Sequence, residues 1–124
     1  MLLVAGIGLA AALWPATTTF GQTCAIRQSA LDSAGRAIDR IAKARILEDA
    51  QADAIGLMSS LRGFIAGGKD CPCGYGTPAI EAAIADLRAF SSTDDIPAAT
   101  RLRAQALPAS WSIVNGLRAC AAPG

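Results

Sequence analysis

The stretch KDCPCGYG, residues 69–76, divides this chain of 124 residues into two halves. It contains Cys71 and Cys73, separated by a single proline, and the other two cysteines, Cys24 and Cys120, lie upstream and downstream of it. Cys24 precedes Cys71 by the same number of residues as Cys73 precedes Cys120. Four cysteines that close two equal segments are typical of a small disulfide-stabilised domain from an oxidising compartment.

The first half has the apolar periodicity of two amphipathic helices, because charged residues from Arg45 onward interrupt the first stripe and a new phase begins at Leu47. Apolar residues recur at helical spacing along one face of each segment, and charged residues take the opposite face. The first stripe is Ile26, Ala30, Leu31, Ala34, Ile38 and Ile41, and the second is Leu47, Ala50, Ala54, Leu57, Met58, Leu61, Phe64 and Ile65. Two glycines, Gly67 and Gly68, predict that the second helix ends in a left-handed cap.

The second half repeats this pattern after the glycine-rich loop. Thr77 followed by Pro78 is typical of a helix start, and a fourth helix is expected to begin near Asp95. Pro108 should kink or end that helix and leave a last short helical piece before Cys120. The stripes are Ile80, Ala83, Ile84, Leu87 and Phe90 in the third helix, Ile96, Ala99, Leu102 and Ala106 in the fourth, and Ile113, Val114 and Leu117 in the last piece.

These patterns predict an all-α fold, in which four main helices form two tandem helical hairpins in an up-down-up-down bundle. The hairpins should span residues 24–71 and 73–120, within a single small domain of residues 22–124. Shifting the chain so that Cys24 falls on Cys73 also places Cys71 on Cys120. An internal duplication and a chance match of two alanine-rich helical pairs both explain this register.

A helical hairpin returns to the place where it began, so Cys24 can meet Cys71 and Cys73 can meet Cys120. We therefore predict the bridges Cys24–Cys71 and Cys73–Cys120. All four cysteines gather at one end of such a bundle, so topology leaves the other two connectivities open, although a Cys71–Cys73 ring would be strained. Each bridge is worth about 4 kcal/mol by chain entropy, a large share of the roughly 5–15 kcal/mol of a small domain.

Residues 1–21 have the features of a signal peptide. The uncharged apolar run from Leu2 to Trp14 has the length of a signal-peptide core, although no Lys or Arg precedes it. Cleavage is expected after Gly21, with Ala12 as a second option. The residues before Cys24 lack the pattern that bacterial lipidation requires, so no stable membrane anchor is expected. We expect an exported protein, periplasmic or extracellular.

Composition argues against several classes of function. Eleven basic and ten acidic residues give a net charge of +1, so we expect no nucleic-acid partner. The chain has no histidine, which removes the most common general base and metal ligand. A basic cluster fits the end of the first helix, where cations complement the helix dipole; its members are Arg36, Arg40, Lys43 and Arg45. We expect no catalytic residues and no cofactor.

The expected function is a non-enzymatic binding or interaction role, with an unidentified protein or a small apolar ligand as the partner. Such a ligand could be carried between the hairpins. Tyr75 and Trp111 are the candidate binding residues, because they are aromatic side chains outside the clear stripes. The alternative is a thiol-redox or soft-metal-binding protein that uses Cys71 and Cys73. Redox motifs usually have two residues between the cysteines, which favours structural bridges.

Overall fold

The computed structural model describes residues 24–73 and 76–124. The described residues form four helices, α4 (Gln28–Lys43), α5 (Leu47–Gly67), α6 (Thr77–Ser92) and α7 (Ile96–Arg118). The all-α class and the four main helices are therefore confirmed. The signal peptide predicted for residues 1–21 lies outside the described residues. None of the described helices is long and apolar enough to cross a membrane.

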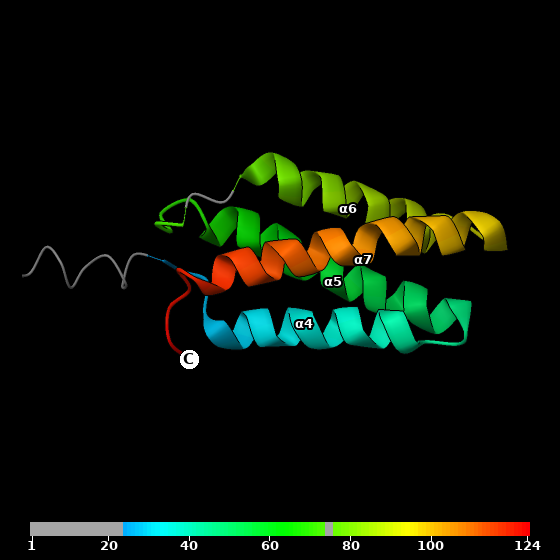
Figure 1. Cartoon of the computed structure of the whole chain (residues 1–124), viewed down its shortest axis with the longest axis horizontal. Helices are drawn as coiled ribbons and strands as arrows, with labels where there is room; N and C mark the ends of the chain where they lie inside the picture. The colour runs from blue at the N-terminus through cyan, green and yellow to red at the C-terminus, as the bar shows by residue number, and fades with distance from the viewer. Residues whose placement is uncertain (1–23, 74–75) are drawn as a thin grey trace, which may run out of the picture.

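The helices pack as an up-down-up-down bundle (Figure 1). Each helix packs against the next one along the chain, and α4 also packs against α7, which closes the ring. In Figure 1, α4 and α6 lie at opposite edges of the view, and α5 and α7 run between them. The ends of both hairpins and the C-terminal segment consequently meet at one end of the bundle.

The apolar stripes supply the core, in which Leu31, Leu57, Leu87 and Phe90 are fully buried. Ala30, however, is exposed, so its predicted place in the first stripe is wrong. Ala30 lines a surface groove together with Ser60 and Gly63 of α5. These two residues are too small to cover Ala30.

Ile96 is also wrongly placed in the predicted core, because its side chain is 60% exposed. It is the first residue of α7, directly after Asp95, whose carboxylate accepts a 2.9 Å hydrogen bond from the Ala98 amide. The first buried residue of α7 is Ala99, about one turn later. Ile96 therefore lies before the part of α7 that packs in the bundle.

α7 continues through Pro108. Of the two predicted effects of this proline, a kink or an end, the end is therefore wrong, and so is the separate short helical piece. A proline inside a helix removes one backbone hydrogen bond and costs about 3 kcal/mol. Ala106 is buried on one side of Pro108, and Ile113 and Val114 are buried on the other. Burial on both sides holds the two parts of α7 against the bundle and offsets this cost.

Gly68 ends α5 with φ −85° and ψ −5°, so the predicted left-handed cap is wrong. Space explains the glycine, because a Cβ atom there would lie 2.6 Å from the carbonyl oxygen of Phe64. The Gly68 amide donates a 2.8 Å hydrogen bond to that same carbonyl. This close turn leads the chain from the end of α5 to Cys71.

The start of α4 is held by the segment that follows α7. The amides of Gln28 and Ser29 donate hydrogen bonds to the carbonyl oxygens of Ala122 and Gly124, at 2.9 Å and 2.7 Å. The Ala122 amide donates in turn to the carbonyl oxygen of Ile26 at 2.8 Å. The first amides of a helix have no partner within it, and α4 has no side-chain cap. The C-terminal segment therefore joins the first helix to the fourth.

Candidate functional site

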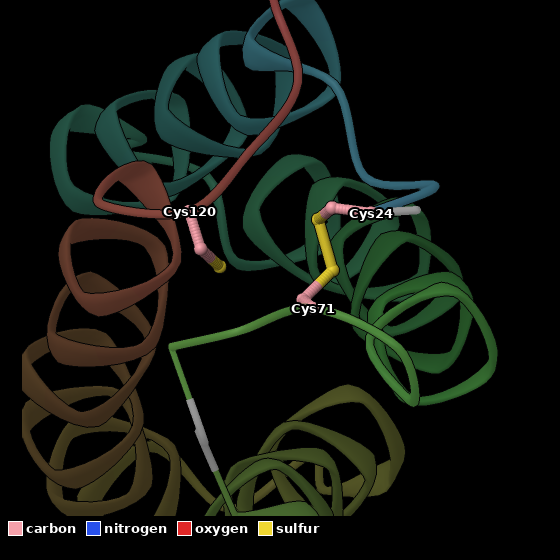
Figure 2. Close-up of side chains that lie close together, drawn as sticks. All are labelled: Cys24, Cys71 and Cys120. Atoms are coloured by element: carbon pink, nitrogen blue, oxygen red, sulfur yellow. A yellow bond between two sulfur atoms is a disulfide. The ribbon is translucent and has the colours of Figure 1, made fainter. Parts of the chain in front are cut away.

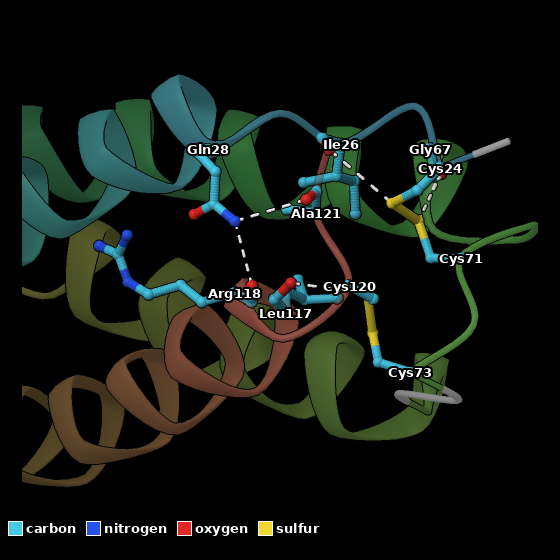
Figure 3. The surroundings of a disulfide bond; sticks show 10 residues. All are labelled: Cys24, Ile26, Gln28, Gly67, Cys71, Cys73, Leu117, Arg118, Cys120 and Ala121. Atoms are coloured by element: carbon cyan, nitrogen blue, oxygen red, sulfur yellow. Dashed lines mark hydrogen bonds between the residues drawn. A yellow bond between two sulfur atoms is a disulfide. The ribbon is translucent and has the colours of Figure 1, made fainter. Parts of the chain in front are cut away.

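The structure contains both predicted bridges, Cys24–Cys71 and Cys73–Cys120, so each of the four cysteines is paired. The Cα atoms lie 4.3 Å apart in the first bridge and 5.3 Å apart in the second. Cys24 precedes α4 and Cys71 follows α5, while Cys73 precedes α6 and Cys120 follows α7 (Figure 3). Each bridge therefore closes one hairpin.

The two bridges differ in exposure. Cys24 and Cys71 are buried, with 3% and 9% of their surface exposed, whereas Cys73 and Cys120 are half-buried. A reagent in solution thus has better access to the Cys73–Cys120 bridge than to the Cys24–Cys71 bridge.

The bridges are also neighbours in space. The Sγ atoms of Cys24, Cys71 and Cys120 all lie within 4.8 Å of one another. Figure 2 shows the Cys120 side chain beside the Cys24–Cys71 bridge. The sulfur of Cys73 does not belong to this group, although it is bonded to Cys120. Cys120 is therefore the cysteine that brings the two bridges together.

This sulfur group has no free thiolate while both bridges are closed. The thiolate is the form of cysteine that attacks disulfides and binds soft metals. Cys71 and Cys73, the pair suggested for redox or metal chemistry, belong to different bridges. That chemistry at this pair would require both bridges to open.

A cavity of about 260 Å³, which we call the cysteine-side cavity, lies beside the bridges, between the two hairpins. Three helices and the loop after α5 contribute to its wall. Its lining residues are Phe64 and Ile65 of α5, Gly68, Lys69, Cys71 and Cys73 of the loop, Thr77 and Ile80 of α6, and Leu117 of α7. Most of these side chains are apolar. The wall includes one cysteine of each hairpin, Cys71 of the first and Cys73 of the second.

Lys69 carries the only charge among the described residues that line this cavity. Lys69 is exposed, so its charge is in contact with water. Sequence reasoning missed Lys69, since nothing in the residues around it indicates an apolar pocket. The cavity is built from side chains that meet only when the hairpins pack.

Trp111 lies on another face of the bundle, in a groove of about 380 Å³ between α4 and α7. It packs over Gly35, where a Cβ atom would lie 3.3 Å from the indole ring. Nearby, Arg118 forms a 2.8 Å ion pair with Asp32. The structure therefore does not bring Trp111 to the cysteine-side cavity, and Tyr75 lies outside the described residues. Their binding roles stay predictions.

The basic cluster of the first helix makes exposed ion pairs. Arg40 lies 3.2 Å from Asp53, and Lys43 lies 3.0 Å from Asp39. Exposed pairs of this kind are worth at most about 1 kcal/mol. These contacts fit a solvated helix end better than an anion-binding site.

Comparisons with protein-family models, with curated proteins and with solved structures find no match for this chain. The cysteine-side cavity is therefore interpreted from its own geometry.

Proposed function

We propose that this protein is an exported, disulfide-stabilised helical protein that binds a small apolar ligand bearing an acidic group. The cysteine-side cavity carries this proposal, because residues of three helices line it, most of them apolar, and Lys69 adds one positive charge. Small-molecule sites typically combine apolar walls with a few placed polar groups. The two disulfides support export to the periplasm or the cell exterior, because disulfides persist in such compartments.

The volume of the cavity limits the size of the ligand. A cavity of about 150 Å³ holds one benzene molecule. In proportion, the 260 Å³ of this cavity accommodates about ten non-hydrogen atoms. Octanoate has this size, and its chain and carboxylate suit the apolar wall and Lys69.

The proposed role is non-enzymatic. The chain has no histidine, and the described residues that line the cavity include no carboxylate. The side chains that most often act as general bases are therefore missing at the cavity. The four cysteines are paired in bridges and contribute shape and stability to the site.

The test is an NMR titration of the isotope-labelled protein with octanoate, and with octylamine as a ligand of opposite charge. We expect saturable shifts at the amides of Phe64, Ile80 and Leu117 with octanoate and weaker binding of octylamine. Lys69→Gln should reduce this difference between the two ligands. Shifts that fail to saturate, or that centre on Trp111, would contradict the proposal.

A matched pair of variants locates the ligand. Ile65→Trp should block binding, because Ile65 is a half-buried residue of the cavity wall. Ile55→Trp is the control on the same helix, since Ile55 is 57% exposed and outside the cavity wall. Equal affinity of both variants for octanoate would place the ligand elsewhere.

A further inference from the structure

We propose that Cys73 is a site of attack by low-molecular-weight thiols, and that the Cys120 thiolate released there attacks the neighbouring Cys24–Cys71 bridge. The disulfides at this end of the bundle would then change partners without net oxidation or reduction. This inference is independent of the binding role proposed above, because it depends on the sulfur positions and not on a bound ligand.

The cavity directs the first attack to Cys73. Both Cys71 and Cys73 line the cavity, and Cys120 is not among its lining residues. Cys71 is 9% exposed, whereas Cys73 is half-buried and thus the more accessible of the two. Lys69 lines the same cavity and attracts anions such as a thiolate or the carboxylates of glutathione.

The first step is a thiol–disulfide exchange. The external thiol loses its proton to solvent, and its sulfur forms a new bond with the Sγ atom of Cys73. The Cys73–Cys120 bond breaks, and its electron pair remains on the Sγ atom of Cys120. The product contains a mixed disulfide at Cys73 and a thiolate at Cys120.

The second step follows from the position of Cys120. Its Sγ atom lies within 4.8 Å of both sulfurs of the Cys24–Cys71 bridge. Attack on Cys71 forms a Cys71–Cys120 bond and leaves the electron pair on Cys24, which takes a proton from solvent. Attack on Cys24 forms a Cys24–Cys120 bond and leaves Cys71 as the thiol. One disulfide breaks as another forms, so the electrons balance.

Backbone hydrogen bonds hold Cys120 close to this bridge after its own bridge has opened. The segments that follow Cys24 and Cys120 are joined by the Ala122 amide, which donates to Ile26, and by the Gln28 amide, which donates to Ala122. The Gln28 side chain also donates to the carbonyl oxygen of Arg118 at 3.0 Å (Figure 3). These contacts do not involve sulfur, so they persist when the Cys73–Cys120 bond is cleaved.

Two matched variants test the second step. Cys73→Ser leaves Cys120 as the free thiol inside the sulfur group, and Cys120→Ser leaves Cys73, which is outside it. Both retain Cys24 and Cys71. Each protein is incubated at mildly alkaline pH, its free thiols are labelled with N-ethylmaleimide, and tandem mass spectrometry locates the label.

In Cys73→Ser we expect label on Cys24 or Cys71 as well as on Cys120. The combined labelling of Cys24 and Cys71 should be at least ten-fold higher in this variant than in Cys120→Ser. In Cys120→Ser the label should stay on Cys73. Equal labelling of Cys24 and Cys71 in the two variants would overturn the proposal. Circular dichroism shows whether both variants are folded.

The wild-type protein provides a second measurement that needs no variant to fold. It is treated with reduced glutathione, quenched with acid and mapped. We expect the glutathione adduct on Cys73, with the free thiol shared between Cys120 and the Cys24–Cys71 pair. An adduct confined to Cys120, or a free thiol that stays wholly on Cys120, would overturn the proposal.

Discussion

Arg103 of α7 donates a 2.9 Å hydrogen bond from Nη1 to the backbone carbonyl oxygen of Ile41, near the end of α4. The same nitrogen lies 3.1 Å from the carbonyl oxygen of Ala44, and the guanidinium lies 5.8 Å from the centre of the Phe90 ring. The last carbonyls of a helix have no partner within it. One side chain of the fourth helix thus satisfies the end of the first helix and helps to close the ring.

Arg103→Ala should lower the free energy of unfolding by about 1–3 kcal/mol, because it leaves two half-buried carbonyls without this donor. Arg40→Ala is the control. Arg40 makes an exposed pair with Asp53, and the loss of this pair should cost less than about 1 kcal/mol. Urea unfolding of both variants measures the difference. Equal losses would mean that the contacts of Arg103 contribute no more to stability than an exposed ion pair does.

Leu57→Ala and Leu87→Ala should each destabilise the protein by about 2–5 kcal/mol, because both side chains are fully buried. Ile55→Ala on the exposed face of α5 should change stability by no more than about 0.5 kcal/mol. Thermal or urea unfolding provides the comparison. Similar small effects at all three positions would show that the buried faces of α5 and α6 are wrongly assigned.

Helices and their buried faces could be predicted from sequence because a stripe at helical spacing has one way to bury itself. The errors occur where a local rule competes with packing. Pro108 is a helix breaker locally, yet buried residues on both sides keep α7 continuous. Ile96 and Ala30 fit the stripes, but Ile96 lies before the part of α7 that packs in the bundle, and the residues that face Ala30 are too small to cover it.

The candidate site could be predicted only in part. Hairpin geometry brings all four cysteines to one end of the bundle and predicts the two bridges, although it does not exclude the other pairings. The grouping of Cys120 with Cys24 and Cys71, and the cavity beside Lys69, depend on how one hairpin packs against the other. No local sequence signal encodes that packing.

Gly56→Ala should raise the free energy of unfolding by about 0.5–1 kcal/mol, since alanine is the better helix former. A Cβ atom at Gly56 meets nothing within 4 Å. Gly35→Ala should gain less, because its Cβ atom would lie 3.3 Å from the Trp111 ring and displace it. Unfolding curves test the stabilities, and Trp111 fluorescence should change only in Gly35→Ala. An unchanged spectrum in that variant would contradict the packing of Trp111 over Gly35.

Ser110→Ala should stabilise the protein by about 1 kcal/mol, because it removes a hydroxyl that is desolvated without compensation. The Ser110 side chain is fully buried, and its oxygen has no hydrogen-bond partner among the described residues. Ser112→Ala on the exposed face of α7 serves as the reference. Urea unfolding that shows a clear loss of stability in Ser110→Ala would mean that this hydroxyl has a partner in the folded protein.

The closure of each hairpin by its own bridge is tested most directly by mapping the disulfides of the purified native protein. Only Pro72 separates Cys71 from Cys73, so the assignment requires partial reduction and cyanylation, which cleaves the chain before each freed cysteine. We predict the pairs Cys24–Cys71 and Cys73–Cys120, no reactive thiol in the native protein, and a mature N-terminus at Gln22. A Cys24–Cys120 or Cys24–Cys73 pair in the untreated protein, or two rapidly reacting thiols, would contradict the structure described above.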